Sequence, residues 1–160
     1  MAGLIRNLTE TRWARLPGGL GWRTAPQQDD WWEQIGLVVC ALAPGETLAM
    51  YHRENDQEDF LVLSGEGTLI VEGEERPLRE WDFFHCPRGV AHAILGGPLV
   101  VIAVGARGHE IAAGTGWGTY PVDPVASKHG VGVEEETDDP DVAYARFGEP
   151  ERKPYDGWLE

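Results

Sequence analysis

The stretch FLVLSGEGTLIVEGEE, residues 60–75, carries most of the information that decides the fold. Residues 60–63 form a short apolar run of strand type, which Gly65-Glu66-Gly67 ends. A second run, Thr68 to Glu72, pairs with it, and Glu72-Gly73-Glu74 is the signal of a tight hairpin. The stretch therefore predicts short antiparallel strands separated by glycine turns.

The same pattern extends outward in both directions. Six further segments are predicted as short strands between turn residues: 35–42, 48–53, 75–78, 83–86, 92–95 and 99–104. The chain is thus expected to place about eight short strands between residues 35 and 105, the spacing of a β-sandwich or barrel. No sustained 3.6-residue period competes with this interpretation. The predicted fold class is all-β, with one barrel.

The two ends of the chain differ from this central region. Residues 1–34 are rich in tryptophan and turn residues, and they predict an N-terminal arm over the barrel or a neighbouring subunit. Residues 106–160 predict an irregular, partly helical C-terminal extension, in which Asp139 as N-cap and Pro140 favour a short helix. Its large apolar residues favour packing on the barrel or on a partner: Trp117, Tyr120, Tyr144, Phe147 and Trp158.

Length and charge narrow the classes of function. The 160 residues suffice for one domain with one core. The formal net charge of −14 opposes binding to nucleic acid and to anionic lipid, so neither partner is expected. No apolar run can span a bilayer and no signal peptide is visible, so a cytoplasmic location is expected. Cys40 and Cys86 form no CxxC motif and are expected to be small buried hydrophobes.

Histidines and carboxylates gather in two segments of the central region. His52 and Glu54 are two residues apart on a predicted strand, so their side chains share a face. The polar residues 55–57 can turn the chain so that Glu58 returns to that side, and His92 can enter from a separate strand. Two histidines and a carboxylate with open positions suit Fe(II), and are also acceptable to Mn, Zn, Ni or Co.

These segments resemble the paired motifs of the cupin superfamily. The first motif runs Gly, five residues, His-x-His, three or four residues, Glu, six residues, Gly. The second runs Gly, five residues, Pro-x-Gly, two residues, His, three residues, Asn. The interval from Glu58 to Gly65 matches, and so does Pro87-x-Gly89-x-x-His92. The resemblance covers residues 35–105 and implies a double-stranded β-helix (jelly-roll) barrel, one divalent metal ion and a small-molecule ligand.

The chain departs from the motifs where the metal would bind. The first histidine comes one residue late, so that Tyr51 takes its nominal place and His52 is the candidate, while Glu54 replaces the second histidine. By the resemblance, His52, Glu58 and His92 keep their roles as ligands and Glu54 becomes the fourth. Two carboxylates shift the preference toward Mn²⁺ or Fe²⁺, with Zn²⁺ also compatible.

Several neighbouring residues have competing interpretations. Glu54 could hold His52 as a hydrogen-bond acceptor without touching the metal. Tyr51, Gln57 and His85 are expected to line the pocket. The alternatives are packing for Tyr51, the turn itself for Gln57, and the outer face of a strand for His85.

Two classes of function remain open. The first is a metal-dependent enzyme acting on a small organic or sugar-like substrate by isomerase, dioxygenase or lyase chemistry, because an incomplete ligand set leaves positions for substrate. The second is a non-catalytic binding or sensor module with a degenerate metal site, which the loss of the second histidine favours. No cluster of cations for a phosphate is evident, since the pocket-side candidates reduce to Arg53 and Arg88. A homodimer is expected, as in small cupins, because an open sheet edge needs covering.

Overall fold

The computed structural model describes residues 5–26, 32–108 and 116–156, so Trp158 lies outside the described residues. Five strands build the barrel: β3 (Ile35–Leu42), β5 (Glu58–Val71), β6 (Glu74–Arg79), β7 (Phe83–Cys86) and β8 (His92–Ala106). The N-terminal part adds η1 (Leu8–Glu10), β1 (Arg12–Arg15) and β2 (Trp22–Thr24). The remaining elements are β4 (Arg53–Glu54), β9 (Gly118–Thr119), α2 (Pro124–Lys128), α3 (Pro140–Ala143) and β10 (Glu151–Pro154).

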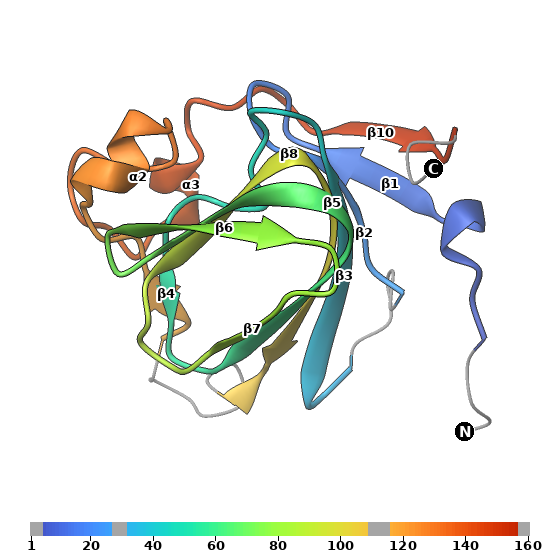
Figure 1. Ribbon diagram of the computed structural model, residues 1–160, viewed down its shortest axis with the longest axis horizontal. Helices are drawn as coiled ribbons and strands as arrows, with labels where there is room; N and C mark the ends of the chain where they lie inside the picture. Colours follow the sequence, from blue (N-terminus) through green and yellow to red (C-terminus); the bar gives the residue numbers. More distant parts are fainter. Residues whose placement is uncertain (1–4, 27–31, 109–115, 157–160) are drawn as a thin grey trace.

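Eight of the described strands form one antiparallel sheet, in which β3 and β5 to β8 curl into a barrel (Figure 1). The hydrogen-bonded order is β10-β1-β2-β3-β8-β5-β6, and β7 pairs with the first part of β5. The long strands β5 and β8 pair from Glu58↔Gly105 to Val71↔His92. Because β5 and β8 bend along this pairing, each contributes to both sides of the barrel. This is the double-stranded β-helix that the sequence predicts.

The barrel strands are fewer and longer than predicted. The expected short strands are halves of longer ones: 60–63 and 68–72 in β5, and 92–95 and 99–104 in β8. Register shifts occur between Val62 and Ser64 and between Gly65 and Gly67, and Gly65 has a φ of 83°. A bulge with glycine at a positive φ bends a strand without ending its pairing. The glycines were therefore wrongly interpreted as terminators.

The predicted strand 48–53 is also largely wrong. Residues 48–51 form bends, His52 makes only an isolated β-bridge with His92, and Arg53 and Glu54 pair with β9 in a separate two-stranded sheet. Other local predictions are confirmed. Strands 35–42 and 83–86 have the expected bounds, and the hairpin at Glu72-Gly73 has positive φ at both positions (49° and 75°).

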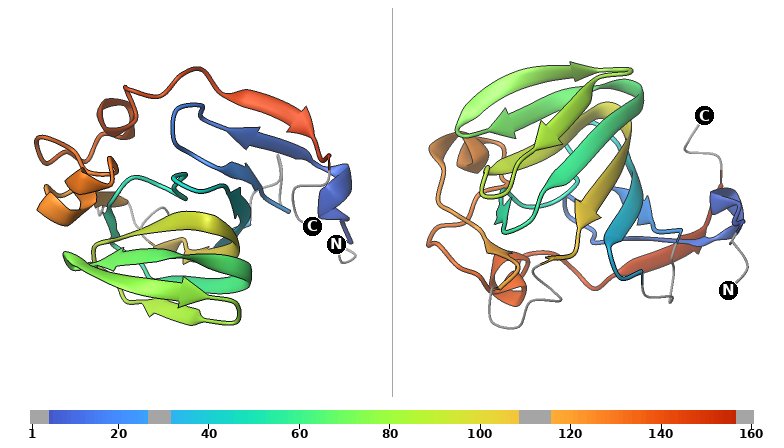
Figure 2. Two further views of the ribbon diagram at one scale, coloured as in Figure 1. Left: turned by 45° about the horizontal axis from the view of Figure 1, so that its top comes forward. Right: turned by 90° about the horizontal axis from the view of Figure 1, so that it is seen from below.

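The barrel interior is a single apolar core of residues from β3, β5, β6, β7 and β8, with Phe60, Val62, Ile94, Leu99 and Val101 almost fully buried. Cys40 and Cys86 are buried free thiols, as expected. On the outside of the barrel, Trp13 of β1 is fully buried against Val39 and Ala41 of β3. Figure 2 shows β1 and β10 side by side outside the barrel, so both ends of the chain meet there.

The C-terminal segment covers one end of the barrel. Helix α3 begins at Pro140, and Asp139 caps it by accepting a hydrogen bond from the Asp141 amide, as predicted. The hydroxyl of Tyr144 accepts a hydrogen bond from the Met50 amide at 3.1 Å, which ties this segment to the bends at 48–51. None of the helices in the described residues has the length and apolar character needed to cross a bilayer.

Candidate metal centre

Two histidines and one carboxylate converge at the mouth of the barrel. Glu58 opens β5 and His92 opens β8, while His52 lies just before β4 and forms a β-bridge with His92. Glu58 Oε2 is 3.4 Å from His52 Nε2 and 3.2 Å from His92 Nε2. One ligand atom from each residue lies within 4.8 Å of the other two. The structure thus brings together three of the four residues that the sequence predicts as ligands.

The far nitrogen of each ring is held by a backbone carbonyl. His52 Nδ1 is 2.7 Å from the Met50 oxygen, and His92 Nδ1 is 3.2 Å from the Val90 oxygen. Because a carbonyl oxygen only accepts, each Nδ1 must carry the proton when it makes this bond. In this tautomer the Nε2 lone pairs of the two neutral rings point toward Glu58, and His92 Nδ1 also lies 3.2 Å from Cys86 Sγ. A second partner on Nδ1 that fixes this tautomer is typical of metal-binding histidines.

The polar atoms at the centre of this group are buried and incompletely satisfied. Glu58 Oε2 and His92 Nε2 are inaccessible to solvent and have no hydrogen-bond partner among the described residues. Ligand atoms that share one ion at about 2.1 Å lie about 3 Å apart, close to the separations observed here. A divalent ion would satisfy both atoms, so the residues fit a metal.

Electrostatics couple the three groups. Burial alone would raise the pKa of Glu58, but the imidazoles of His52 and His92, whose Nε2 atoms lie 3.4 Å and 3.2 Å from Oε2, outweigh it and lower that pKa to about 2. Burial opposes the charged form of His52, yet hydrogen bonding and the charge of Glu58, with that of Glu54, raise its pKa above 6.5. Without an ion, a proton on His52 supplies the positive charge that balances the Glu58 carboxylate.

Glu54 lies beside the centre rather than within it. Its Oε1 is 3.8 Å from His52 Nε2, and its side chain is 21% exposed against 13% for Glu58. Glu54 belongs to β4 and lines the same pocket as Glu58.

The three residues expected to line the pocket lie elsewhere. His85 is on the outer face of β7 with its side chain 53% exposed, and its Nδ1 is 2.6 Å from Asp59. Gln57 is exposed and donates to the Asp59 carboxylate. Tyr51 is buried on the other side of the chain, where its hydroxyl accepts from the Gly73 amide. Side chains alternate along strands, so neighbours of a site residue in sequence often point away from the site.

The pocket that contains Glu54 and Glu58 has a volume of about 300 Å³. Its other walls were not assigned to the site from the sequence. The rings of Trp117 and Tyr120 each lie 6.1 Å from the ring of His52, and Tyr144 and Arg23 complete the wall. Arg23 therefore lines the pocket, whereas the predicted Arg53 and Arg88 do not line it. In the sequence, only the large apolar residues of the C-terminal extension indicated that this segment packs against the barrel.

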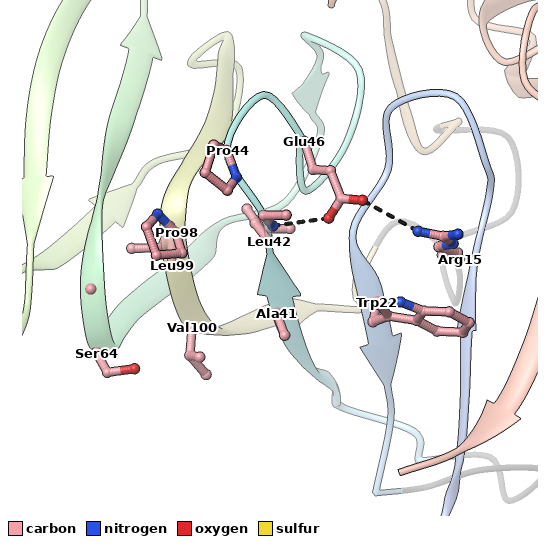
Figure 3. A pocket seen from close by; sticks show the side chains of 12 residues that line it. Arg15, Trp22, Ala41, Leu42, Pro44, Glu46, Ser64, Pro98, Leu99 and Val100 are labelled. Carbon is pink, nitrogen blue, oxygen red and sulfur yellow. Dashed lines mark hydrogen bonds and ion pairs between the residues drawn. The ribbon is translucent and has the colours of Figure 1, made fainter. Parts of the chain in front are cut away.

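Another hollow, of about 330 Å³, opens on the outside of the barrel (Figure 3). Its charged groups engage one another, because Arg15 Nη1 is 3.5 Å from Glu46 Oε1 and the Ala43 amide donates to Glu46 Oε2. Apolar residues such as Trp22, Leu99 and Val100 make up much of the remaining wall. Among the described residues, the lining of this hollow includes no group of potential ligand atoms like that of His52, Glu58 and His92.

Comparison with known proteins identifies the barrel. A family model described as Cupin domain matches residues 38–105. An uncharacterised protein of Aquifex aeolicus is 45% identical over 42 residues, which are 26% of this chain and 34% of that protein. The match thus spans about a third of the length of that relative, so its sequence carries no further information on activity.

Solved structures share the same architecture. A protein of Acidithiobacillus ferrooxidans, proposed to be a sugar phosphate isomerase, is 29% identical with a TM-score of 0.51, over 57% of this chain and 62% of that one. KdgF from a Halomonas species is 19% identical with a TM-score of 0.54, over 66% and 94%. The polyketide cyclase RemF of Streptomyces resistomycificus is 16% identical with a TM-score of 0.53, over 66% and 80%. At 19% and 16% identity, the last two proteins show only that the fold is shared.

Proposed function

The chain is a member of the cupin superfamily, with its cupin domain at residues 38–105, and from this we propose that it is a metal-dependent enzyme acting on a small organic substrate. His52, Glu58 and His92 bind one divalent ion, of which Fe, Mn and Zn suit the donor set best and Ni or Co are also compatible. The substrate occupies the adjoining pocket.

One observation carries this proposal. Two buried imidazoles are fixed by backbone carbonyls so that their Nε2 atoms face one buried carboxylate oxygen, and Glu58 Oε2 and His92 Nε2 lack a hydrogen-bond partner in the described residues. Leaving such atoms unsatisfied costs about 1–3 kcal/mol each. A site that serves only the stability of the fold has no reason to retain them.

Among the reaction classes, isomerisation of a hydroxylated carbonyl compound has the most support. The bound ion would polarise a carbonyl or hydroxyl oxygen of the substrate. Glu54 lines the pocket with its Oε1 3.8 Å from His52 Nε2, and there it would take a proton from the substrate and return it. The likeness to the A. ferrooxidans protein, proposed to be a sugar phosphate isomerase, is consistent with this class.

Metal binding by matched variants tests the proposal. Protein reconstituted with Mn²⁺ or Zn²⁺ should bind one ion, and His92→Ala and Glu58→Gln should each weaken that binding markedly. Glu54→Gln should retain the ion and lose turnover on hydroxylated carbonyl compounds. Failure of the wild type to bind any of the five metals after reconstitution would refute the proposal. Loss of the ion from Glu54→Gln to the same extent as from Glu58→Gln would make Glu54 a ligand instead of the proton-transfer group.

A non-catalytic binding module is the second candidate, and the replacement of a family histidine by Glu54 favours it. A binding module would hold the ion and a ligand without turnover in the wild type. The metal-loaded wild type and Glu54→Gln would then behave alike with every substrate in the screen.

We also propose a homodimer in the cytoplasm, as predicted from the sequence. Trp81 and Phe83 are large apolar side chains that are 69% and 64% exposed in the single chain, a feature that an interface would explain. Light scattering of the purified protein measures the oligomeric state directly. A monomer at micromolar concentration would exclude the dimer.

A further inference from the structure

Three arginines from the two ends of the chain line one hollow beside the metal pocket. Arg12 lies on β1, Arg23 on β2 and Arg152 on β10, and together they line a cavity of about 280 Å³. The other described residues that line this cavity are uncharged: Trp13, Ala14, Thr24, Ala25 and Val38. We refer to Arg12, Arg23 and Arg152 as the arginine cluster.

The strand register places the arginine cluster on the face of the sheet that continues into the barrel interior. Ala14 pairs with Arg152 on one side and with Arg23 on the other, and directly opposed residues of antiparallel strands share a face. Arg23 is in turn opposite Cys40, which belongs to the barrel core. Arg12 is two residues from Ala14 and so shares that face. Figure 2 shows these strands running outward from the barrel.

Arg23 connects the arginine cluster to the metal pocket. Arg23 and Val38 line both cavities, which therefore share a wall. Burial raises the pKa of Cys40 to about 11, and the positive charge of Arg23 opposes that rise. Burial likewise raises the pKa of Tyr120 and Tyr144, and Arg23 again acts in the opposite direction. The charge of Arg23 is therefore felt inside the metal pocket.

The composition of this hollow contrasts with that of the whole chain. The protein has 27 Asp and Glu against 13 Lys and Arg, yet three of those 13 cations line one small cavity whose described lining holds no carboxylate. Guanidinium groups are planar forks that bind oxyanions through paired hydrogen bonds. The two guanidinium groups of Arg23 and Arg152 match a dianionic phosphate better than they match a single carboxylate.

We propose that the arginine cluster binds the phosphate group of a phosphorylated small molecule, whose other end passes Arg23 into the metal pocket. The placement of the organic part of the ligand in the metal pocket rests on the proposed function, whereas the phosphate site does not. The ion and Glu54 act on the organic part of the substrate, and the arginine cluster selects for its phosphate. Arg23 is thus a specificity-determining residue contributed from outside the cupin domain at 38–105.

Inorganic phosphate, titrated into the metal-free full chain by calorimetry, tests the anion site independently of the metal. The wild type should bind phosphate, and Arg23→Met and Arg152→Met should each weaken binding about tenfold to hundredfold, because a hydrogen bond between charged groups is lost. Arg152 is exposed on an edge strand, so its replacement leaves the fold intact even if Arg23→Met proves unstable. Arg79→Met is the matched control, since Arg79 is an 87% exposed cation away from the cluster, and it should bind like the wild type.

Glycerol phosphate and glycerol, titrated into the metal-loaded protein, test selectivity. The wild type should prefer glycerol phosphate about tenfold or more, and Arg23→Met should lose that preference while keeping the ion. A wild type that does not bind phosphate, or binding that is unchanged in both methionine variants, would overturn the inference. If no metal binds but phosphate binding depends on Arg23 and Arg152, the proposed function is wrong and the phosphate site stands.

Discussion

Replacing Glu58 by Gln in the metal-free protein should remove a pH-dependent part of the free energy of unfolding. Burial works against the Glu58 carboxylate, but the nearby imidazoles of His52 and His92 lower its pKa from 4.5 to about 2. A carboxyl group with a lowered pKa in the folded state stabilises the fold fully above its unfolded-state pKa. That contribution is lost as the pH falls through the folded-state pKa. The window therefore runs from about pH 4.5 down to about pH 2.

The size of the effect follows from the shift. Each pH unit corresponds to about 1.4 kcal/mol, so the interval between 4.5 and about 2 gives a contribution on the order of 3 kcal/mol. The Glu58 side chain is only 13% exposed, so solvent screens this contribution little. The stability difference between wild type and Glu58→Gln should be largest near pH 6 and should shrink by about 3 kcal/mol as the pH approaches 2.

Urea unfolding of chelator-treated protein, followed by fluorescence of its seven tryptophans, measures this difference at each pH. Glu80→Gln is the matched control, because Glu80 is exposed between β6 and β7 and carries the same charge. A gap between wild type and Glu58→Gln that stays constant from pH 6 to pH 2 would refute the reasoning. So would an equal change in Glu80→Gln, since the effect would then belong to overall charge.

Three further predictions concern the site and the segment that covers it. The apparent affinity for Zn²⁺ should rise about tenfold or more between pH 6 and pH 8, because the pKa of His52 is raised and protons compete with the ion. A Zn²⁺ affinity that does not change with pH in metal titrations would contradict this. Tyr144→Phe should lower the free energy of unfolding in urea by about 1–3 kcal/mol, because the buried Met50 amide loses its hydrogen-bond acceptor. An unchanged unfolding midpoint would show that the Tyr144 hydroxyl does not stabilise the fold. Asp139→Ala should cost about 1 kcal/mol in the same assay through loss of the α3 cap, while an equal loss in the neighbouring Asp138→Ala would point to charge instead.

The sequence could bring His52, Glu58 and His92 together because short-range rules suffice for them. His52 bridges His92, and Glu58 follows one polar turn later, so strand alternation and the motif spacing determine their common side. That they bind a metal stays a prediction.

His85 shows where this reasoning ends. Phe83 and Phe84 are adjacent and both apolar, so the alternation of β7 has no clear phase in the sequence, and only pairing with β5 turns Phe83 and His85 outward.

The remaining errors come from long-range pairing. From the sequence, Gly65 and Gly67 predicted a turn that ends the strand. Only the continuous hydrogen bonding of β5 to β8 shows that the strand bends at these glycines and continues. Arg152 and Arg23 share a face because β1 lies between β10 and β2, a juxtaposition of residues more than a hundred positions apart in the chain. No motif or periodicity encodes such a contact, and the sequence therefore predicted Arg53 and Arg88 on the pocket side instead.

The origin of each part of the site limits what can be carried over from other cupins. Glu58 and His92 lie on β5 and β8, inside the segment 38–105 that the family shares. The residues that would recognise a substrate come from outside it, with Arg23 on β2 and Trp117, Tyr120 and Tyr144 in the C-terminal segment. A protein that shares only the barrel therefore shares the candidate metal ligands on β5 and β8 without sharing the residues that line the rest of the pocket. A common metal centre, even at high identity within 38–105, is consequently weak evidence for a common substrate, and the segments before and after the barrel are where specificity has to be sought.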